Sequence, residues 1–107
     1  MQSFGCEVQR NDRYVVEFDE EVCNEEWMAE FREFFYDFYS LSEHARHIAQ
    51  FRARFGSSFI EGYGIPLENG EVPFWVQSDV RKKQVNHAIN IKLVSEDENI
   101  SVDVDVL

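Results

Sequence analysis

Four acidic side chains stand at steps of four, three and four residues along the chain: Glu26, Glu30, Glu33 and Asp37. Residues at these steps are neighbours on the surface of a helix, and at a rise of ~1.5 Å per residue the row would be ~16 Å long. Carboxylates ~5–6 Å apart approximate the phosphate repeat of a nucleic acid closely enough to engage a groove of Arg and Lys side chains. The spacing therefore predicts a binding surface for cationic groups, with Tyr36 at its edge.

The same pattern has two other interpretations, which stay open. One is a solvated helix face on an ordinary acidic protein, and the other is contact with a basic protein that does not bind nucleic acid. No lysine interleaves the row to relieve the repulsion, which costs a few tenths of a kcal/mol for each like-charged pair. On that ground we interpret the row as functional. Asp103 and Asp105 share one face of a predicted strand and are second candidates for contact, although an exposed polar face explains them as simply.

Residue types that carry catalysis or bind metals occur without the spacing that such sites need. His44 and His47 diverge by ~60° on a helix and no cysteine joins them as a ligand, while His87 lies in a different predicted element. Ser57 and Ser58 have no nucleophile elbow around them. We therefore expect surface or boundary histidines, no catalytic residue, no metal and no cofactor.

The composition is that of a folded, acidic domain. The 107 residues are 44% hydrophobic and 15% aromatic and carry a net charge of −11. This length fits a single domain over residues 1–107, and the charge disfavours direct binding to nucleic acids or anionic membranes. No run approaches the ~18 apolar residues of a membrane span. Cys6 and Cys23 predict free thiols in a cytoplasmic protein, with one disulfide as the alternative.

Charge is also segregated along the chain. Residues 17–43 hold ten acids and one base, a net of −9, whereas residues 44–56 hold three arginines and no acid, a net of +3. One of these arginines, Arg52, falls within the apolar stripe of a predicted helix. We expect it to extend to solvent or to pair with an acid of the preceding helix.

Two strands and two helices are predicted in the first half of the chain. Alternating apolar residues at 3–9 and 14–18, with a turn at 10–12, predict an N-terminal hairpin. Asn24 caps a helix that runs to about Tyr39. Ser40 and Glu43 form the capping box of a second helix, which ends at Gly56 and either folds back on the first or bends sharply away from it. The buried face of the first helix is predicted to comprise Trp27, Met28, Phe31, Phe34, Phe35 and Phe38.

Four further strands are predicted in the second half. Residues 65–76 form a hairpin around Asn69-Gly70, which favours a type I′ turn, and the flanking prolines place it at a sheet edge. Residues 85–94 and 100–106 alternate in polarity as two more strands. The expected fold class is α+β, an antiparallel sheet of about four to six strands with a two-helix hairpin packed on one face.

The row at residues 26, 30, 33 and 37, the acidic last strand, the small size and the α+β layout together resemble small acidic phage-encoded inhibitors of the anti-CRISPR and antirestriction type. The resemblance implies a non-enzymatic inhibitor, in the cytoplasm of a bacterial host, that binds a basic, nucleic-acid-binding surface of a defence complex by nucleic-acid mimicry. Immunity proteins that neutralise nuclease toxins have a similar character and are the alternative. From another class, a small ligand-binding or enzymatic domain would use the aromatic segment 59–75. The sequence does not indicate an oligomeric state.

Overall fold

The computed structural model describes residues 1–96 and 101–106. It is an α+β structure whose strands form two small sheets, one of two strands in the order β1-β5 and one of three in the order β2-β4-β3. In the described part of the chain no helix has the length and apolarity needed to span a membrane. In chain order the elements are β1 (Phe4–Gln9), β2 (Arg13–Phe18), α1 (Glu25–Phe34), α2 (Leu41–Phe55), β3 (Ile65–Glu68), α3 (Asp79–Lys83), β4 (Val85–Ser95) and β5 (Ser101–Val106).

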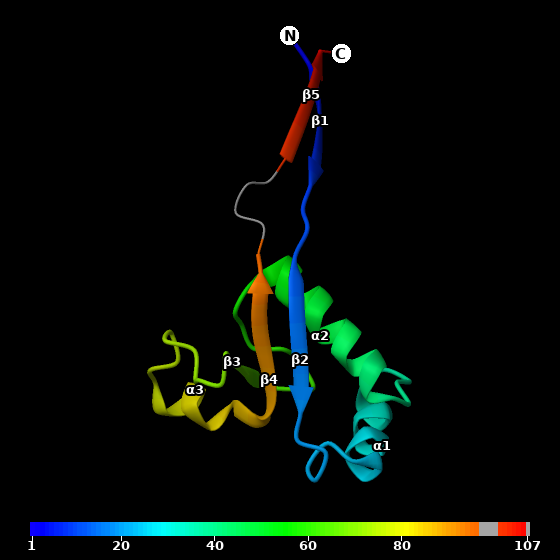
Figure 1. Cartoon of the computed structure of the whole chain (residues 1–107), viewed down its shortest axis with the longest axis vertical. Coiled ribbons are helices and arrows are strands. Elements are labelled where there is room, and N and C mark those ends of the chain that lie inside the picture. Colours follow the sequence, from blue (N-terminus) through cyan, green and yellow to red (C-terminus); the bar gives the residue numbers. More distant parts are fainter. Residues whose placement is uncertain (97–100, 107) are drawn as a thin grey trace.

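The strands β1 and β2 do not form the predicted N-terminal hairpin. They follow one another nearly in line (Figure 1), with β1 paired to β5 and β2 paired to β4, both antiparallel. A type I′ hairpin turn needs positive φ at its central residues, and among the described non-glycine residues positive φ occurs at Asn69, not at residues 10–12. The chain therefore passes through 10–12 without reversing, and β1 leaves the rest of the molecule as one half of a projecting two-stranded ribbon.

The segment 65–76 forms the predicted turn but not the predicted hairpin. Asn69 and Gly70 have φ of 50° and 80°, as a type I′ turn requires, and the amide of Glu68 donates to the carbonyl of Glu71 at 2.8 Å. The antiparallel hydrogen bonding between the two sides of the turn stops at this pair, because Pro73 has no N–H to donate. β3 instead pairs in parallel with β4, so the expectation of one antiparallel sheet of four to six strands was wrong.

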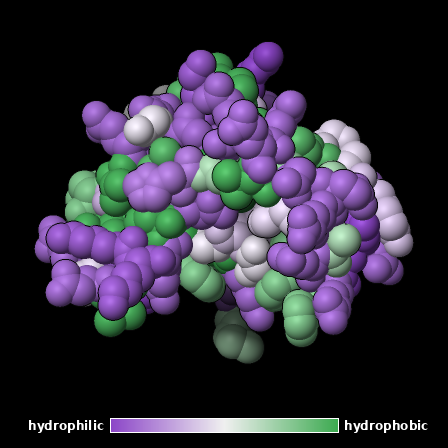
Figure 2. Space-filling view, turned by 90° about the horizontal axis from the view of Figure 1, so that it is seen from below, coloured by the Kyte–Doolittle hydropathy of each residue, from purple (hydrophilic) through white to green (hydrophobic). Residues whose placement is uncertain are grey.

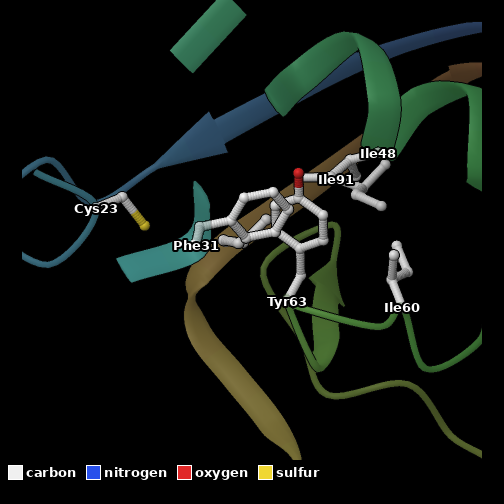
Figure 3. Close-up of a cluster of buried hydrophobic side chains, with 7 residues drawn as sticks. Cys23, Phe31, Ile48, Ile60, Tyr63 and Ile91 are labelled. Carbon is white, nitrogen blue, oxygen red and sulfur yellow. The ribbon is translucent and has the colours of Figure 1, made fainter. Parts of the chain in front are cut away.

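The core lies between α2 and the three-stranded sheet, and α2 packs obliquely against β2 (Figure 1). Tyr14, Val16 and Phe18 of β2 alternate toward this core, as their period of two predicted. Figure 3 shows the rings of Phe31 and Tyr63 pointing toward one another, with centroids 4.9 Å apart. The fully or almost fully buried cluster comprises Cys23, Phe31, Ile48, Ile60, Tyr63, Ile89 and Ile91.

The first helix is shorter than predicted. α1 ends at Phe34, because Phe35 leaves the helical region with φ −126° and ψ −105°, and five residues intervene before Ser40 caps α2 by accepting from the amide of Glu43 at 3.3 Å. α1 lies beyond the end of α2 rather than alongside it as a hairpin (Figure 1). Its predicted aromatic face is only partly buried, since Phe34 is 76% exposed.

Candidate protein-binding surface

The helix α1 presents Glu26, Glu30 and Glu33 to solvent. The side chain of Asn24 caps it by accepting from the amide of Trp27 at 3.0 Å, and the buried ring of Phe31 anchors the opposite side in the core. This anchoring fixes which side of the helix faces out. Within the described part of the chain, none of the three carboxylates makes a hydrogen bond or ion pair, so all three can accept contacts from a partner.

The base nearest this row in the sequence is already engaged elsewhere. Arg32 pairs with Glu25 at 2.6 Å and donates to the carbonyl of Phe38 at 3.0 Å. Its guanidinium also lies 4.3 Å from the centre of the Tyr39 ring, a distance typical of a cation–π contact. Arg32 therefore ties the end of α1 to the following segment instead of neutralising the row.

Asp37 does not continue the row on the helix. It is exposed, but it lies after the end of α1, so three carboxylates and not four share the helical face. From Glu26 to Glu33 this face spans only ~10 Å at ~1.5 Å per residue. Tyr36 is 53% exposed and lies in the same inter-helix segment, with its ring 5.0 Å from that of His47.

The second candidates, Asp103 and Asp105, lie far from this row. β5 occupies the projecting end of the molecule and α1 the opposite end (Figure 1), along the 55 Å principal axis. On the ribbon Asp103 is paired across the strands with Glu7 and Asp105 with Gly5. The structure thus separates the sequence-predicted acids into two surfaces that one small partner site cannot contact together.

Further carboxylates add to the α1 end. Asp19, Glu20 and Glu21 are exposed in the connection between β2 and α1, and Figure 2 views this end of the molecule, where hydrophilic side chains predominate with hydrophobic patches between them. The count of acids over residues 17–43 already indicated this concentration of charge. It did not show that the β2–α1 connection, which holds these three, lies at the same end of the molecule as α1 (Figure 1).

Sequence reasoning missed a shallow groove beside α2. It has a volume of about 270 Å³, and it brings together the inter-helix segment, α2 and the start of the segment 59–75. Phe35 was predicted on the buried face of the first helix, yet it is 40% exposed, and Phe55 at the end of α2 is 60% exposed. No local pattern distinguishes them from core positions. The lining residues are Phe35, Tyr36, His47, Phe51, Arg54, Phe55, Ile60 and Glu61.

One of the three histidines differs from the surface or boundary position expected of it, whereas His47 is half-buried and His87 is exposed, as predicted. His44 is completely buried, and its Nδ1 lies 2.8 Å from the hydroxyl of Tyr63. Burial lowers the pKa of His44 and raises that of Tyr63, so both groups are neutral near pH 7. Aromatic rings enclose the pair, including those of Trp27 and Phe31, which makes it part of the core. Tyr63, a member of the aromatic segment 59–75, is therefore a packing residue.

Arg52 pairs with acids other than those predicted. It is 8% exposed and bonds to Glu68 and Glu96, the latter at 2.8 Å, rather than to an acid of α1. Glu96 also accepts from Tyr14 at 3.3 Å and lies 3.5 Å from Arg10. This network joins α2, β3 and the base of the ribbon, because Glu68 is the last residue of β3 and Glu96 is the residue after β4.

Residues suited to metal binding or covalent chemistry are dispersed. Across residues 1–96 and 101–106, no three His, Cys, Asp or Glu side chains gather as metal ligands. Cys6 is exposed, Cys23 is buried, and both are free thiols. The arrangement that stands out chemically is thus the unpaired carboxylate row on α1. No protein-family model, curated protein or solved structure matches the chain.

Proposed function

We propose that this protein is a non-enzymatic binding protein whose α1 carboxylates engage a basic, nucleic-acid-binding surface of another protein. One observation carries the proposal: the carboxylates of Glu26, Glu30 and Glu33 are exposed, and no basic side chain of the described residues pairs with them. Arg32, the base within the same helix, is held by Glu25 and by the carbonyl of Phe38. A partner that supplies Arg or Lys side chains would relieve the repulsion along the row, and this relief favours association.

The neighbouring side chains support a protein partner. Tyr36, with half of its surface exposed, follows Glu33 by three residues and lines the groove beside α2, and tyrosines are enriched at protein interfaces. Asp19, Glu20 and Glu21 extend the negative surface toward the β2–α1 connection. We assign the contact to the α1 end and treat Asp103 and Asp105 on the ribbon as outside it, because the two regions lie at opposite ends of the molecule.

The proposed target is a nucleic-acid-binding complex of a bacterial defence system, following the resemblance to small acidic inhibitors. The test begins with capture of partners from bacterial lysate on the immobilised protein at low salt, followed by elution with increasing salt. Exposed charges are screened over ~8–10 Å at moderate ionic strength, so the captured partner should elute early. The partner should then lose nucleic-acid binding when the purified protein is added in competition.

The residue-level test is the double variant Glu30→Lys, Glu33→Lys. It should abolish binding to the captured partner while the circular dichroism spectrum stays unchanged, since exposed substitutions alter stability by under ~0.5 kcal/mol each. The matched control is Asp103→Lys, Asp105→Lys, which makes the same change in net charge at the opposite end and should retain most of the affinity. If both double variants bind like the wild type, the α1 row is only a solvated face and the proposal fails.

The identity of the captured protein separates the proposal from its alternative. A nuclease toxin that is inactivated on binding, with the same dependence on Glu30 and Glu33, would assign the protein as an immunity protein. A component of a defence complex would assign it as an inhibitor of that complex.

A further inference from the structure

The ribbon formed by β1 and β5 has one entirely apolar face. The antiparallel register pairs Phe4 with Val106, Cys6 with Val104 and Val8 with Val102, and directly paired residues lie on the same side of a sheet. The alternate pairs, Gly5 with Asp105 and Glu7 with Asp103, place carboxylates on the other side. One side of this narrow sheet therefore carries uncharged side chains and the other carries acids.

Nothing in the described part of the chain covers this apolar face. Phe4 is 54% exposed, Val104 is 58% exposed and Val106 is 79% exposed, and β1 and β5 pack substantially only on each other. The ribbon projects from the body of the protein, the part formed by β2 to β4 with the helices (Figure 1). An isolated two-stranded ribbon is at best marginally stable in water, and stability requires further strands or a packed face.

We propose that the apolar face of the ribbon is a homodimer interface, covered by the same face of a second copy. The six side chains of this face are uncharged, so two copies of it can meet without electrostatic repulsion. The opposite face of each ribbon carries Glu7, Asp103 and Asp105. Packing apolar face on apolar face keeps the carboxylates of both copies outside the contact. Packing the two acidic faces together would bring like charges together in a protein of net charge −11, and packing an acidic face on an apolar face would bury carboxylates without a partner.

The shape of the molecule selects the symmetry. A two-fold axis that runs between the two ribbons, parallel to their faces and perpendicular to the strands at their midpoints, places the two bodies at opposite ends and avoids a clash between them. Under this axis β1 lies over β1 of the partner, so Cys6 faces its own copy and Phe4 faces Val8. The contact is isologous, as closed dimers require, and it produces a small four-stranded sandwich.

The size of the face sets the strength of the dimer. Six residues at ~3.3 Å and two strands ~4.8 Å apart give a face of ~20 Å by ~10 Å, well below the ~800 Å² per partner of a standard stable interface. The dimer should therefore form reversibly and depend on protein concentration. Added salt should strengthen it, because screening weakens the repulsion between two acidic bodies without affecting the apolar contact. Association through the α1 row would show the opposite dependence on salt.

Sedimentation of the wild-type protein over a range of concentrations provides the first test. The mass should rise from 12.7 kDa toward twice that value, and more readily at high salt. Val104→Asp, at the centre of the apolar face, should raise the dissociation constant at least about tenfold, because the contact would bury a charge without a partner. The matched control Gln9→Asp adds the same charge on the polar face and should leave dimerisation unchanged at high salt.

Cross-linking through Cys6 tests the predicted geometry in the unmodified sequence. Facing sheets lie ~10 Å apart, so a short bismaleimide should join the two Cys6 thiols, whereas a disulfide, whose Cα atoms lie ~5.5 Å apart, should not form readily. Cys23 is buried and does not compete in the folded protein. Cys6→Ser should abolish the cross-link and still sediment as a dimer.

Three results would overturn the proposal. The wild type could remain at monomer mass at the highest concentration and salt, it could assemble beyond a dimer, or it could dimerise without Cys6 cross-linking. The first two refute the closed face-to-face contact, and the third moves the interface elsewhere. Because each is measured on the wild type, a Val104→Asp variant whose ribbon unfolds cannot obscure the answer.

Discussion

The body and the ribbon use the same alternation of apolar and polar residues with opposite results. In β2 the apolar side of the strand, Tyr14, Val16 and Phe18, packs on a core of aromatic and branched residues. In the ribbon the equivalent side, exemplified by Val8 and Val104, is exposed. Alternation therefore determines which side of a strand is apolar, whereas the covering layer depends on what else the chain brings to that place. The difference can be tested by comparing substitutions in the two regions.

The largest effect should come from Phe31→Ala in the body. Phe31 is 4% exposed and its ring contacts those of Tyr63 and His44 at centroid distances of 4.9 and 4.7 Å. Removing a buried ring leaves a cavity and costs ~3–5 kcal/mol. Urea unfolding followed by circular dichroism should show this loss in the free energy of unfolding. A midpoint equal to that of the wild type would remove Phe31 from the core.

A smaller loss is expected at the junction of the two regions. Arg52→Ala removes two charged contacts, to Glu68 and to Glu96, and hydrogen bonds to charged groups contribute ~1.5–3 kcal/mol each before solvent screening is considered. Because both carboxylates are partly exposed, we expect a total loss of ~1.5–3 kcal/mol. The exposed Arg46→Ala is the control and should change the free energy by under ~0.5 kcal/mol. Similar losses for the two variants would mean that the network does not stabilise the junction.

The body should also lose stability as the pH falls. Burial lowers the pKa of His44, so the unfolded chain takes up the proton first as the pH drops through ~6.5. The contribution of the neutral, buried His44 to the free energy of unfolding is complete above about pH 7. Below that pH it is lost at up to ~1.4 kcal/mol per pH unit. His44→Phe should flatten the slope measured between pH 7 and 5.5. Some slope should persist because burial also lowers the pKa of His47.

The same unfolding measurements on the wild type provide the control for this pH dependence. If His44→Phe retains the wild-type slope between pH 7 and 5.5, titration of the buried histidine is not the cause.

The smallest effect on the free energy of unfolding should come from Val102→Asp in the ribbon. Val102 is 50% exposed and lies outside the core cluster, so the change should cost under ~0.5 kcal/mol at concentrations where the protein is monomeric. Urea unfolding monitored by tryptophan fluorescence reports on the body, which holds Trp27 and Trp75. A loss in the free energy of unfolding comparable to that of Phe31→Ala would show that ribbon and body unfold as one unit. The two regions would then not differ in how much they contribute to stability.

The features that were predictable from the sequence are local ones. Asn24 and Ser40 cap their helices, and Gly56 ends α2 with a positive φ of 74°, because each requires only hydrogen bonds or backbone angles within a few residues. The turn at Asn69-Gly70 follows for the same reason. The exposure of Glu30 on α1 also agrees with helical spacing, while its role in binding a partner stays a prediction.

The features that escaped prediction depend on contacts between distant segments. Alternation in β1 gives its two faces but does not name β5 as its partner. The aromatic spacing that continues to Phe38 favoured a longer α1, whereas Arg32 bonding to the carbonyl of that residue stabilises a non-helical segment. His44 was misplaced because its burial depends on the hydroxyl of Tyr63 from a later loop. The groove beside α2 was missed because it is assembled from three separate segments.

The pairing of the first strand with the last also constrains the order in which the molecule assembles. Joining Phe4 to Val106 directly would close a loop of almost the whole chain, and the entropic cost of closure grows with loop length. Once β2 has paired with β4, most of that loop is already closed. β1 can then pair with β5 residue by residue, starting at the end next to the body. We expect the ribbon to form last during folding, after β5 has left the ribosome. Phe4 and Val106 are paired at the tip of the ribbon, so a label attached at either position would lie at the same place, far from α1 (Figure 1).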